Sequence, residues 1–122
     1  MENGELSKEL LNKWASLFEV IGNPTRLGIL LVLYGSEFLT SDGVHSLTFG
    51  QVKDIMEIPS EQSLEYHLKR LTDAKLIDKE PYKDPKGRVY PIYHVTQKWR
   101  DFIRETGLVK SLTNFVEDNL LK

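Results

Sequence analysis

One stretch decides the fold of this chain: Pro59-Ser60-Glu61-Gln62-Ser63-Leu64-Glu65-Tyr66-His67-Leu68-Lys69-Arg70-Leu71. Proline biases the residue before it away from helical angles, so a new helix is expected to begin here with Ser60 as its cap. Leu64, Leu68 and Leu71 recur at intervals of four and three, which predicts a helix with a narrow apolar stripe. The other side chains of the stretch are mostly polar, with a basic pair near its end. Such a helix is suited to lie between a hydrophobic core and a polar surface.

The composition is that of an ordinary globular protein. The chain has 122 residues, 40% of them hydrophobic and 28% charged, which suits one domain with its own core. It contains no cysteine, so disulfides and thiolate metal sites are excluded. The longest apolar run, residues 29–34, is too short to span a bilayer, and the opening Met-Glu-Asn-Gly-Glu is unlike a signal peptide. We therefore expect a cytoplasmic protein without a membrane partner.

Charge alone does not suggest a nucleic-acid-binding protein. The formal net charge is −2 and the isoelectric point is about 5.9, whereas simple electrostatic binders of nucleic acids are basic. Residues 1–59 carry four Lys or Arg against eight Asp or Glu. Residues 60–90 carry seven against six, and residues 91–122 carry five against four. Positive charge is therefore shifted weakly towards the middle of the chain.

Two helices are expected before the 59–71 stretch. Residues 6–21 form a broad apolar face with a helical period, ending at Gly22, and the face belongs either to the core or in part to a subunit interface. The second helix starts at Asn23-Pro24, with asparagine as the cap and proline in the first turn, and is expected to end near Gly35. It is apolar nearly all round, as a buried central helix is. Arg26 could reach either a phosphate or a carboxylate.

A helix-turn-helix is predicted over about residues 49–74. Residues 35–47 are rich in turn formers, and Leu47-Thr48-Phe49 could be a short strand. A short helix is expected over about residues 49–57, followed by a turn at Ile58-Pro59-Ser60 and then by the helix of the opening stretch. Two helices joined by so short a turn are typical of this motif, whose second helix reads the DNA major groove.

A wing is predicted directly after this motif, over about residues 76–95. Residues 76–82 and 88–95 read as two strands around a turn at 83–87, and Pro81 restricts the first strand to the edge of a sheet. Thr96 can cap a further helix with Trp99, Phe102 and Ile103 facing inward, which Gly107 ends. Residues 108–121 form a last amphipathic segment. The predicted fold class is mainly α with a small β-hairpin, in a single winged helix-turn-helix domain over residues 1–122.

The order of these elements resembles that of the ArsR-like winged helix-turn-helix regulators. Asn23-Pro24-Thr25-Arg26-Leu27-x-Ile29-Leu30 is similar to the entry into that family's second helix. Ser60-x-x-x-Leu64-x-Tyr66-His67-Leu68-x-x-Leu71-x-x-Ala74-x-Leu76-Ile77 is similar to its recognition helix and the step into the wing. The resemblance covers about residues 14–99, or roughly two-thirds of the chain.

The resemblance implies a homodimer that binds a palindromic operator, usually as a repressor. Family members dimerise through their first and last helices, which here span residues 6–21 and about 97–121. The implied interface residues are Leu10, Trp14, Phe18, Leu112, Phe115, Val116 and Leu120. Many relatives sense metals through cysteines or through Asp and His sites in the last helix. This chain has no cysteine, and residues 97–122 have no histidine, so no metal site and no cofactor are expected.

The candidate DNA-binding residues lie on the recognition helix and on the wing. Side chains on the first turns of a recognition helix reach base edges, and basic side chains nearby contact phosphates. The candidates are Gln62, Ser63, Tyr66, Lys69, Arg70, Lys83, Lys86 and Arg88. Each could instead be an ordinary solvated side chain. Glu61 and Glu65 are left out because carboxylates repel phosphate, and His67, beside the apolar stripe, is expected to be a packed, hydrogen-bonded structural residue.

The sequence therefore predicts a DNA-binding transcriptional regulator. A winged helix used as a protein-interaction module in a transcription or chromatin assembly is the alternative, which the acidic balance favours. A small-molecule effector in an interface lined by Trp14, Trp99 or Phe115 is a further possibility, although aromatic side chains at helical spacing more often serve packing. No phosphate loop, nucleophile elbow or paired-carboxylate motif is present in the sequence, so no enzymatic activity is expected.

Overall fold

The structure, a computed structural model, describes residues 8–39, 46–107, 114 and 118. Its elements are, in chain order, α1 (Lys8–Ile21), α2 (Pro24–Leu39), β1 (Leu47–Thr48), α3 (Phe49–Met56), α4 (Glu61–Asp73), β2 (Ile77–Lys83), β3 (Val89–Val95) and α5 (Gln97–Thr106). The helix-turn-helix, the wing strands and the helix ended by Gly107 are thereby confirmed. The predicted last segment, residues 108–121, lies outside the described residues apart from 114 and 118.

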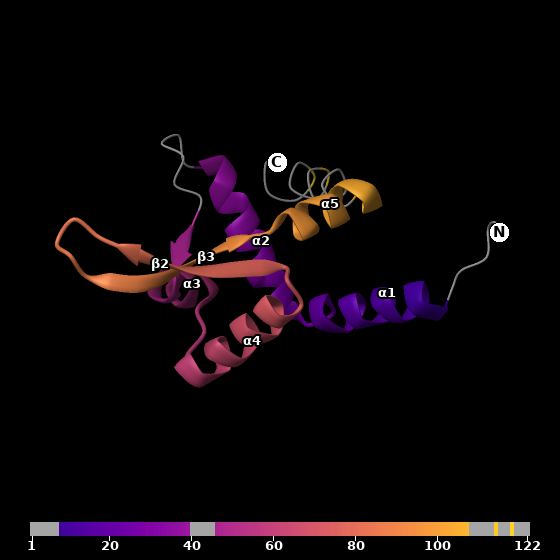
Figure 1. The fold of residues 1–122 in the computed structure, drawn as a ribbon, viewed down its shortest axis with the longest axis horizontal. Helices are drawn as coiled ribbons and strands as arrows, with labels where there is room; N and C mark the ends of the chain where they lie inside the picture. The colour runs from indigo at the N-terminus through magenta and orange to yellow at the C-terminus, as the bar shows by residue number, and fades with distance from the viewer. Residues whose placement is uncertain (1–7, 40–45, 108–113, 115–117, 119–122) are drawn as a thin grey trace.

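The three strands form one antiparallel sheet in the order β1-β3-β2. The hairpin runs in register from Ile77 opposite Val95 to Lys83 opposite Val89, and β1 adds only two pairs to the other edge of β3. The short strand that the sequence suggested at residues 47–49 is present over Leu47–Thr48, and it joins the predicted hairpin in one sheet. The strand containing Pro81 is an edge strand, as expected. In Figure 1 the tip of the hairpin projects from one side of the molecule, whereas α1 extends to the opposite side.

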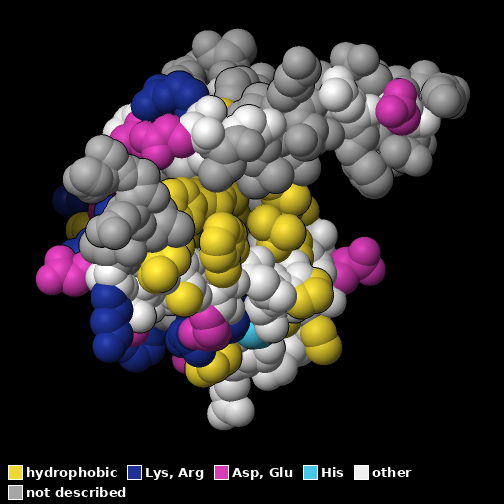
Figure 2. Space-filling model, turned by 90° about the vertical axis from the view of Figure 1, so that its right-hand side faces the viewer, with side chains coloured by type: hydrophobic (Ala, Val, Ile, Leu, Met, Phe, Trp, Pro, Cys, Tyr) yellow, Lys and Arg dark blue, Asp and Glu magenta, His cyan; other side chains and the backbone are white. Residues whose placement is uncertain are grey.

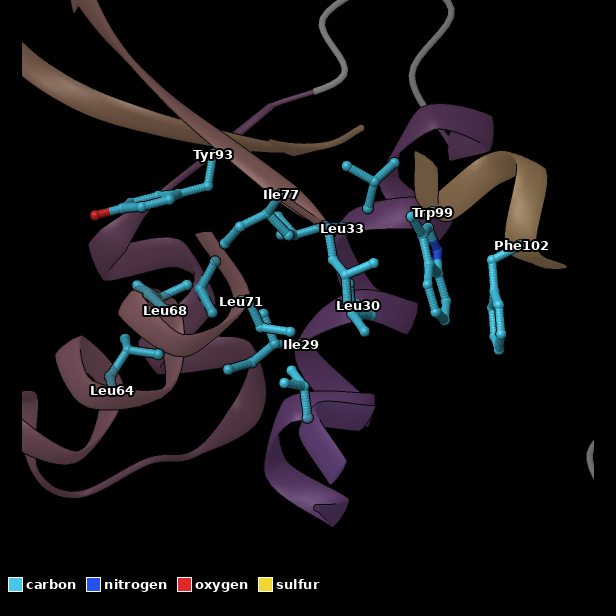
Figure 3. Close-up of a cluster of buried hydrophobic side chains, with 14 of the residues drawn as sticks. Ile29, Leu30, Leu33, Leu64, Leu68, Leu71, Ile77, Tyr93, Trp99 and Phe102 are labelled. Atoms are coloured by element: carbon cyan, nitrogen blue, oxygen red, sulfur yellow. The ribbon is translucent and has the colours of Figure 1, made fainter. Parts of the chain in front are cut away.

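The core lies where α2, α4 and α5 meet the inner face of the sheet (Figure 3). The leucine stripe of α4 is buried, with Leu64 and Leu71 fully inaccessible and Leu68 3% exposed. These side chains belong to one cluster with members from α2, the sheet and α5, among them Ile29, Leu30, Leu33, Ile77, Tyr93 and Trp99. Burying one such leucine stabilises the fold by about 1.5–3 kcal/mol. The stripe therefore fixes which side of α4 faces outward.

Helix α2 is longer than predicted. It passes through Gly35 and ends at Leu39, so the prediction that it stops near Gly35 was wrong. Ser36 donates its hydroxyl to the carbonyl of Leu33, which is compatible with a continuing helix. Glu37 then forms an ion pair with Arg100 of α5 at 2.6 Å. This contact with a distant part of the chain stabilises the extra turn, and nothing in the local sequence signals it.

The junction between α1 and α2 is a sharp corner that requires glycine. The two helices meet at 88°. The amide of Gly22 donates to the carbonyl oxygen of Phe18 at 2.7 Å, and a Cβ at this position would lie only 2.8 Å from the same oxygen. Asn23 then caps α2 by accepting from the amide of Arg26 at 3.0 Å, as predicted. This corner places the end of α1 beside α4.

Helix α4 is delimited by a capped start and two turns without glycine. Ser60 accepts from the amide of Ser63 at 3.2 Å, which confirms the predicted cap. Glu57, before α4, and Lys75, after it, both adopt left-handed backbone angles, with φ of 53° and 63°. Such angles are uncommon for residues other than glycine. Hydrogen bonds of the following amides, from Ile58 to the Lys53 carbonyl and from Leu76 to the Leu71 carbonyl, hold both turns.

Candidate nucleic-acid interface

The outer face of α4 carries three of the predicted DNA-binding residues. Gln62, Tyr66 and Lys69 are exposed and lie opposite the buried leucine stripe. Tyr66 is 53% exposed, which is unusual for a large aromatic side chain and leaves its ring available to a ligand. Lys69 forms an ion pair with Asp73 at 3.1 Å, but both side chains are exposed, so the pair is weak. Ser63 is half-buried beside them.

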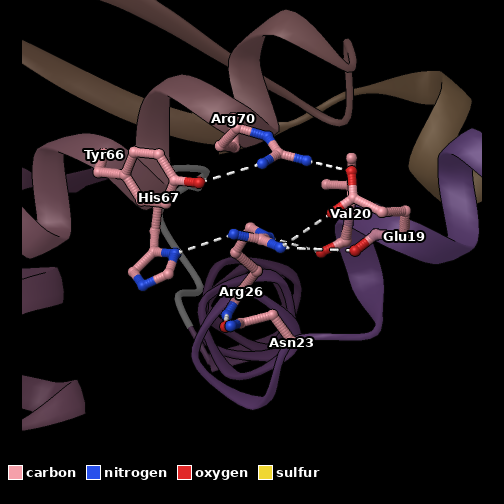
Figure 4. A network of polar contacts seen from close by, with 7 residues as sticks. All are labelled: Glu19, Val20, Asn23, Arg26, Tyr66, His67 and Arg70. Carbon is pink, nitrogen blue, oxygen red and sulfur yellow. Dashed lines mark hydrogen bonds and ion pairs between the residues drawn. The ribbon is translucent and has the colours of Figure 1, made fainter.

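Arg70 is engaged within the protein. Its guanidinium donates to the Tyr66 hydroxyl at 3.1 Å and to the carboxylate of Glu19 on α1 (Figure 4). The side chain is 31% exposed, so part of it still reaches solvent. Arg70 therefore links the recognition helix to α1 and orients the Tyr66 ring from behind. The sequence predicted a DNA contact or an ordinary solvated charge here and not this ion pair, because a partner 51 residues away leaves no local signal.

Arg26 links α1, α2 and α4 in a buried network (Figure 4). Arg26 is only 5% exposed. Its Nε donates to the carbonyl of Val20 at 2.6 Å, and its Nη1 lies 3.2 Å from Nδ1 of His67. The guanidinium also lies 3.6 Å from the carboxylate of Glu19. Of the two partners considered from the sequence, the structure therefore shows the carboxylate, together with a carbonyl and an imidazole. Arg26 holds the recognition helix against the α1–α2 corner.

The geometry fixes the protonation of His67. An arginine can only donate, so Nδ1 of His67 must accept and its proton must be on Nε2. Burial lowers the pKa of His67, and the positive charges of Arg26 and Arg70 lower it further. The predicted structural, hydrogen-bonded histidine is confirmed.

The tip of the wing is organised by Asp84. Its carboxylate accepts from the amides of Lys86 and Arg88 at 2.9 and 2.8 Å and from Nε of Arg88 at 2.6 Å. Burial alone would raise the pKa of Asp84, but these hydrogen bonds, those from Arg88 foremost, lower it overall. Gly87, with φ of 84°, completes the turn. Asp-Pro-Lys-Gly is a sequence signature of such a turn, and the sequence predicted the turn but not this role of Asp84.

The basic residues of the wing are presented to solvent. Lys83, Lys86 and Arg88 are exposed, and the Arg88 side chain is 70% exposed although its Nε is bound to Asp84. The structure thus gathers the predicted residues into two groups, one on α4 and one at the wing tip. Tyr82 and Tyr90 pack against each other across the hairpin at 5.6 Å between ring centroids. This pair stiffens the wing between the sheet and its tip.

A second surface of interest is apolar and lies on α1 and α5. Phe18 and Leu11 are 53% and 50% exposed, and the rings of Trp14, Phe18 and Phe102 lie 5.6–6.3 Å apart in a mutual cluster. Figure 2 shows hydrophobic side chains gathered on this side of the molecule. Of the predicted interface residues, Trp14 and Phe18 are therefore together. The side chain of Leu10 and all of Leu112, Phe115, Val116 and Leu120 lie outside what the structure describes.

Within the described part of the chain, no group of three His, Asp or Glu side chains could hold a metal ion. Over the same residues, no single helix is long and apolar enough to cross a membrane; only the bent pair of α1 and α2 reaches that length and hydropathy together.

A helix-turn-helix followed by a two-stranded wing, with β1 completing the sheet from before the motif, defines a winged helix-turn-helix protein. Comparison with protein families gives one match, over residues 14–83, to the family described as "Domain of unknown function (DUF7347)", and the chain belongs to this family. A comparison with curated protein sequences gives no match.

Solved structures with the same fold include several transcriptional regulators. The reduced form of the transcriptional regulator YodB from B. subtilis matches with a TM-score of 0.62 and 16% identity, over 95% of this chain and 96% of that chain. A MarR-family transcriptional regulator from Porphyromonas gingivalis matches with a TM-score of 0.62 and 17% identity, over 97% of this chain and 100% of that chain. A transcriptional regulator homologue from Pyrococcus horikoshii matches with a TM-score of 0.59 and 19% identity, over 92% of this chain and 97% of that chain. These likenesses show the fold, and the resemblance to ArsR-like proteins in particular stays a prediction.

Proposed function

We propose that this protein is a sequence-specific DNA-binding transcriptional regulator. The observation that carries the proposal is the outer face of α4, where Gln62 and Tyr66 are exposed on a helix whose other face is fixed in the core. Solved structures of the same fold that are described as transcriptional regulators support it. Glutamine can pair with adenine through two hydrogen bonds, and the exposed lysines and arginine of the wing can contact phosphates.

The proposed working form is a homodimer that binds a palindromic operator as a repressor. The exposed side chains of Leu11 and Phe18, and the half-buried Trp14 that packs against Phe18, support a subunit interface on α1. We propose that the chain, as one domain, adds its segment 97–121 to this interface. Two recognition helices would then enter successive major grooves about 34 Å apart. Sedimentation of the full chain tests the dimer: Phe18→Glu should yield monomers, and an unchanged dimer would move the interface elsewhere.

The DNA proposal is tested by titrating the full chain against a fluorescent duplex from the region upstream of its own gene, beside an unrelated duplex. We expect tighter binding to the upstream DNA and an affinity that falls steeply with salt. Gln62→Ala and Tyr66→Ala should reduce the preference by about 1–3 kcal/mol each if they contact bases. Lys86→Ala should weaken both duplexes equally, whereas Lys13→Ala on α1 is the matched control and should change neither.

Binding that is weak and indifferent to sequence and salt would refute the DNA proposal. It would favour the alternative, a protein-interaction module, for which the exposed carboxylates of Glu61 and Glu65 on α4 would be contact groups.

A further inference from the structure

Glu61 and Glu65, whose negative charges would repel DNA phosphates, lie in a groove between the recognition helix α4 and the wing. The groove has a volume of about 650 Å³ and is walled by α4 on one side and by β2 and β3 on the other. Glu61 and Glu65 line it from α4, and because they are four residues apart they lie one above the other on the same face. Neither carboxylate has an ion-pair or hydrogen-bond partner among the described residues. They are therefore free to bind a ligand.

The inner end of the groove is apolar and aromatic. Phe49, Leu68 and Pro91 line it together with the ring of Tyr93. Leu68 and Tyr93 are 3% and 5% exposed, so this part of the wall belongs to the core and is fixed in place. An apolar wall beside two carboxylates suits a ligand that has a flat apolar body and a charged end.

Tyr93 adds a polar group that the fold leaves unused. Its hydroxyl points away from Ile77 and Leu33 in the core (Figure 3), and it makes no hydrogen bond within the part of the chain that the structure describes. Among the described residues, the buried side-chain polar atom without a hydrogen-bond partner is Nε1 of Trp99 and not the Tyr93 hydroxyl, so this hydroxyl is open to the groove although the rest of its side chain is buried. Burial raises the pKa of Tyr93, and the negative charge of Glu65 raises it further. The hydroxyl therefore stays protonated at neutral pH and can donate to or accept from a ligand.

The charged side chains that line the groove favour a positively charged ligand. Three carboxylates line it against two ammonium groups, and one of each, Lys69 and Asp73, already pair with each other at 3.1 Å on the rim. Lys79 on β2 faces the two glutamates as a single positive charge. Apart from Lys69, which is paired with Asp73, the charged side chains that α4 contributes to the groove are therefore carboxylates. Carboxylates and aromatic faces together are the groups that bind organic ammonium ions.

We propose that this groove is a binding site for a small organic cation with an aromatic body, such as an aromatic primary amine. The ammonium group lies between Glu61 and Glu65, the ring packs against Phe49 and Tyr93, and the Tyr93 hydroxyl hydrogen-bonds the polar end. The site does not depend on DNA binding, because the protein alone supplies every group that forms it.

The experiment follows amide resonances of the ¹⁵N-labelled full chain during titration with benzylamine, without DNA. Benzyl alcohol and benzoate serve as neutral and anionic probes of the same shape. We expect benzylamine to shift the resonances of residues around the groove with a dissociation constant on the order of 1 mM, as suits so small a ligand. The other two probes should bind at least tenfold more weakly. Equal binding of benzylamine and benzyl alcohol would overturn the proposal.

Two variants and one matched control locate the site. Glu65→Gln and Tyr93→Phe should each weaken benzylamine binding about tenfold or more. Glu80→Gln removes the same charge from β2, but Glu80 neighbours Lys79 along the strand and therefore lies on the opposite face of the sheet. Glu80→Gln should bind benzylamine as tightly as the unmodified chain does. A loss of affinity as large as that of Glu65→Gln would show that only the overall charge of the protein matters, and would overturn the proposed site. The spectrum of each variant reports its fold directly. Because DNA is absent, failure here is separate from failure of the DNA proposal.

Discussion

Replacing Arg26 should destabilise the fold more than any exposed arginine would. Arg26→Met keeps most of the aliphatic stem but removes the guanidinium, which is buried and donates to the Val20 carbonyl at 2.6 Å and to His67 Nδ1 at 3.2 Å. Hydrogen bonds from a charged donor contribute about 1.5–3 kcal/mol each, and here two acceptors would be left unpaired. We expect the free energy of unfolding to fall by about 3 kcal/mol.

Urea unfolding followed by tryptophan fluorescence measures this change, at one protein concentration so that any dimerisation affects all samples equally. With a slope of about 1.5 kcal/mol per molar urea, the midpoint should fall by about 2 M. Arg104→Met is the matched control, because Arg104 pairs with Asp101 on the exposed face of α5 and its loss should cost less than about 0.5 kcal/mol. Equal midpoints for the two variants would refute the view that the Arg26 network holds α4 in place.

Three further outcomes are expected. Gly22→Ala should lower the free energy of unfolding by about 1–3 kcal/mol, since its Cβ would meet a backbone carbonyl at 2.8 Å. Gly28→Ala, whose Cβ would meet only the methyl group and sulfur at the flexible end of the Met56 side chain, should be neutral or stabilise by up to about 1 kcal/mol. Thermal unfolding compares the two variants, and equal losses would contradict the reasoning. Because the folded state lowers the pKa of His67 below its usual 6.5, the unfolded chain binds this proton more readily than the folded chain does. The contribution of neutral His67 to the free energy of unfolding should therefore be fully present above about pH 6.5 and decrease as the pH falls below it. The decrease should be smaller in His67→Asn, and equal pH profiles of the two proteins would contradict this role of His67. Because the folded state also lowers the pKa of Asp84 below 3.8, the contribution of this carboxylate to stability should be present above pH 3.8 and be lost below it. Asp84→Ala should speed amide hydrogen exchange at the wing tip while leaving the amides of α4 protected. Unchanged exchange at the tip would contradict this role of Asp84.

The features predicted from the sequence are those with a local signal. The leucine spacing of residues 64–71, the cap at Ser60 and the turn chemistry before Gly87 each operate within a few residues, so the recognition helix and wing were predicted correctly. The dual position of α4, with one face buried and one exposed, follows from the same spacing. The candidate DNA residues on its outer face could therefore be named before the structure was known.

The features that sequence could not predict depend on contacts between distant residues. The extra turn of α2 is stabilised by Glu37 and Arg100, which are 63 residues apart, and the Arg26–His67 contact spans 41. Such pairs have no periodicity to detect. For the same reason the sequence predicted Arg70 as a DNA contact or a solvated charge and did not predict its ion pair with Glu19. The groove that holds Glu61 likewise exists only once β2 and β3 fold back over α4.

The turns on either side of α4 determine how this helix meets a ligand. No glycine occurs between Gly50 and Gly87, and the two left-handed positions in this interval, Glu57 and Lys75, are held by hydrogen bonds of their neighbours. The helix therefore has no flexible joint at either end. Its surface is preorganised, so association loses little backbone entropy. If α4 binds DNA as proposed, it would discriminate by shape: a DNA site would have to possess, or be deformed into, the matching groove width. Specificity would then include base pairs that no side chain touches.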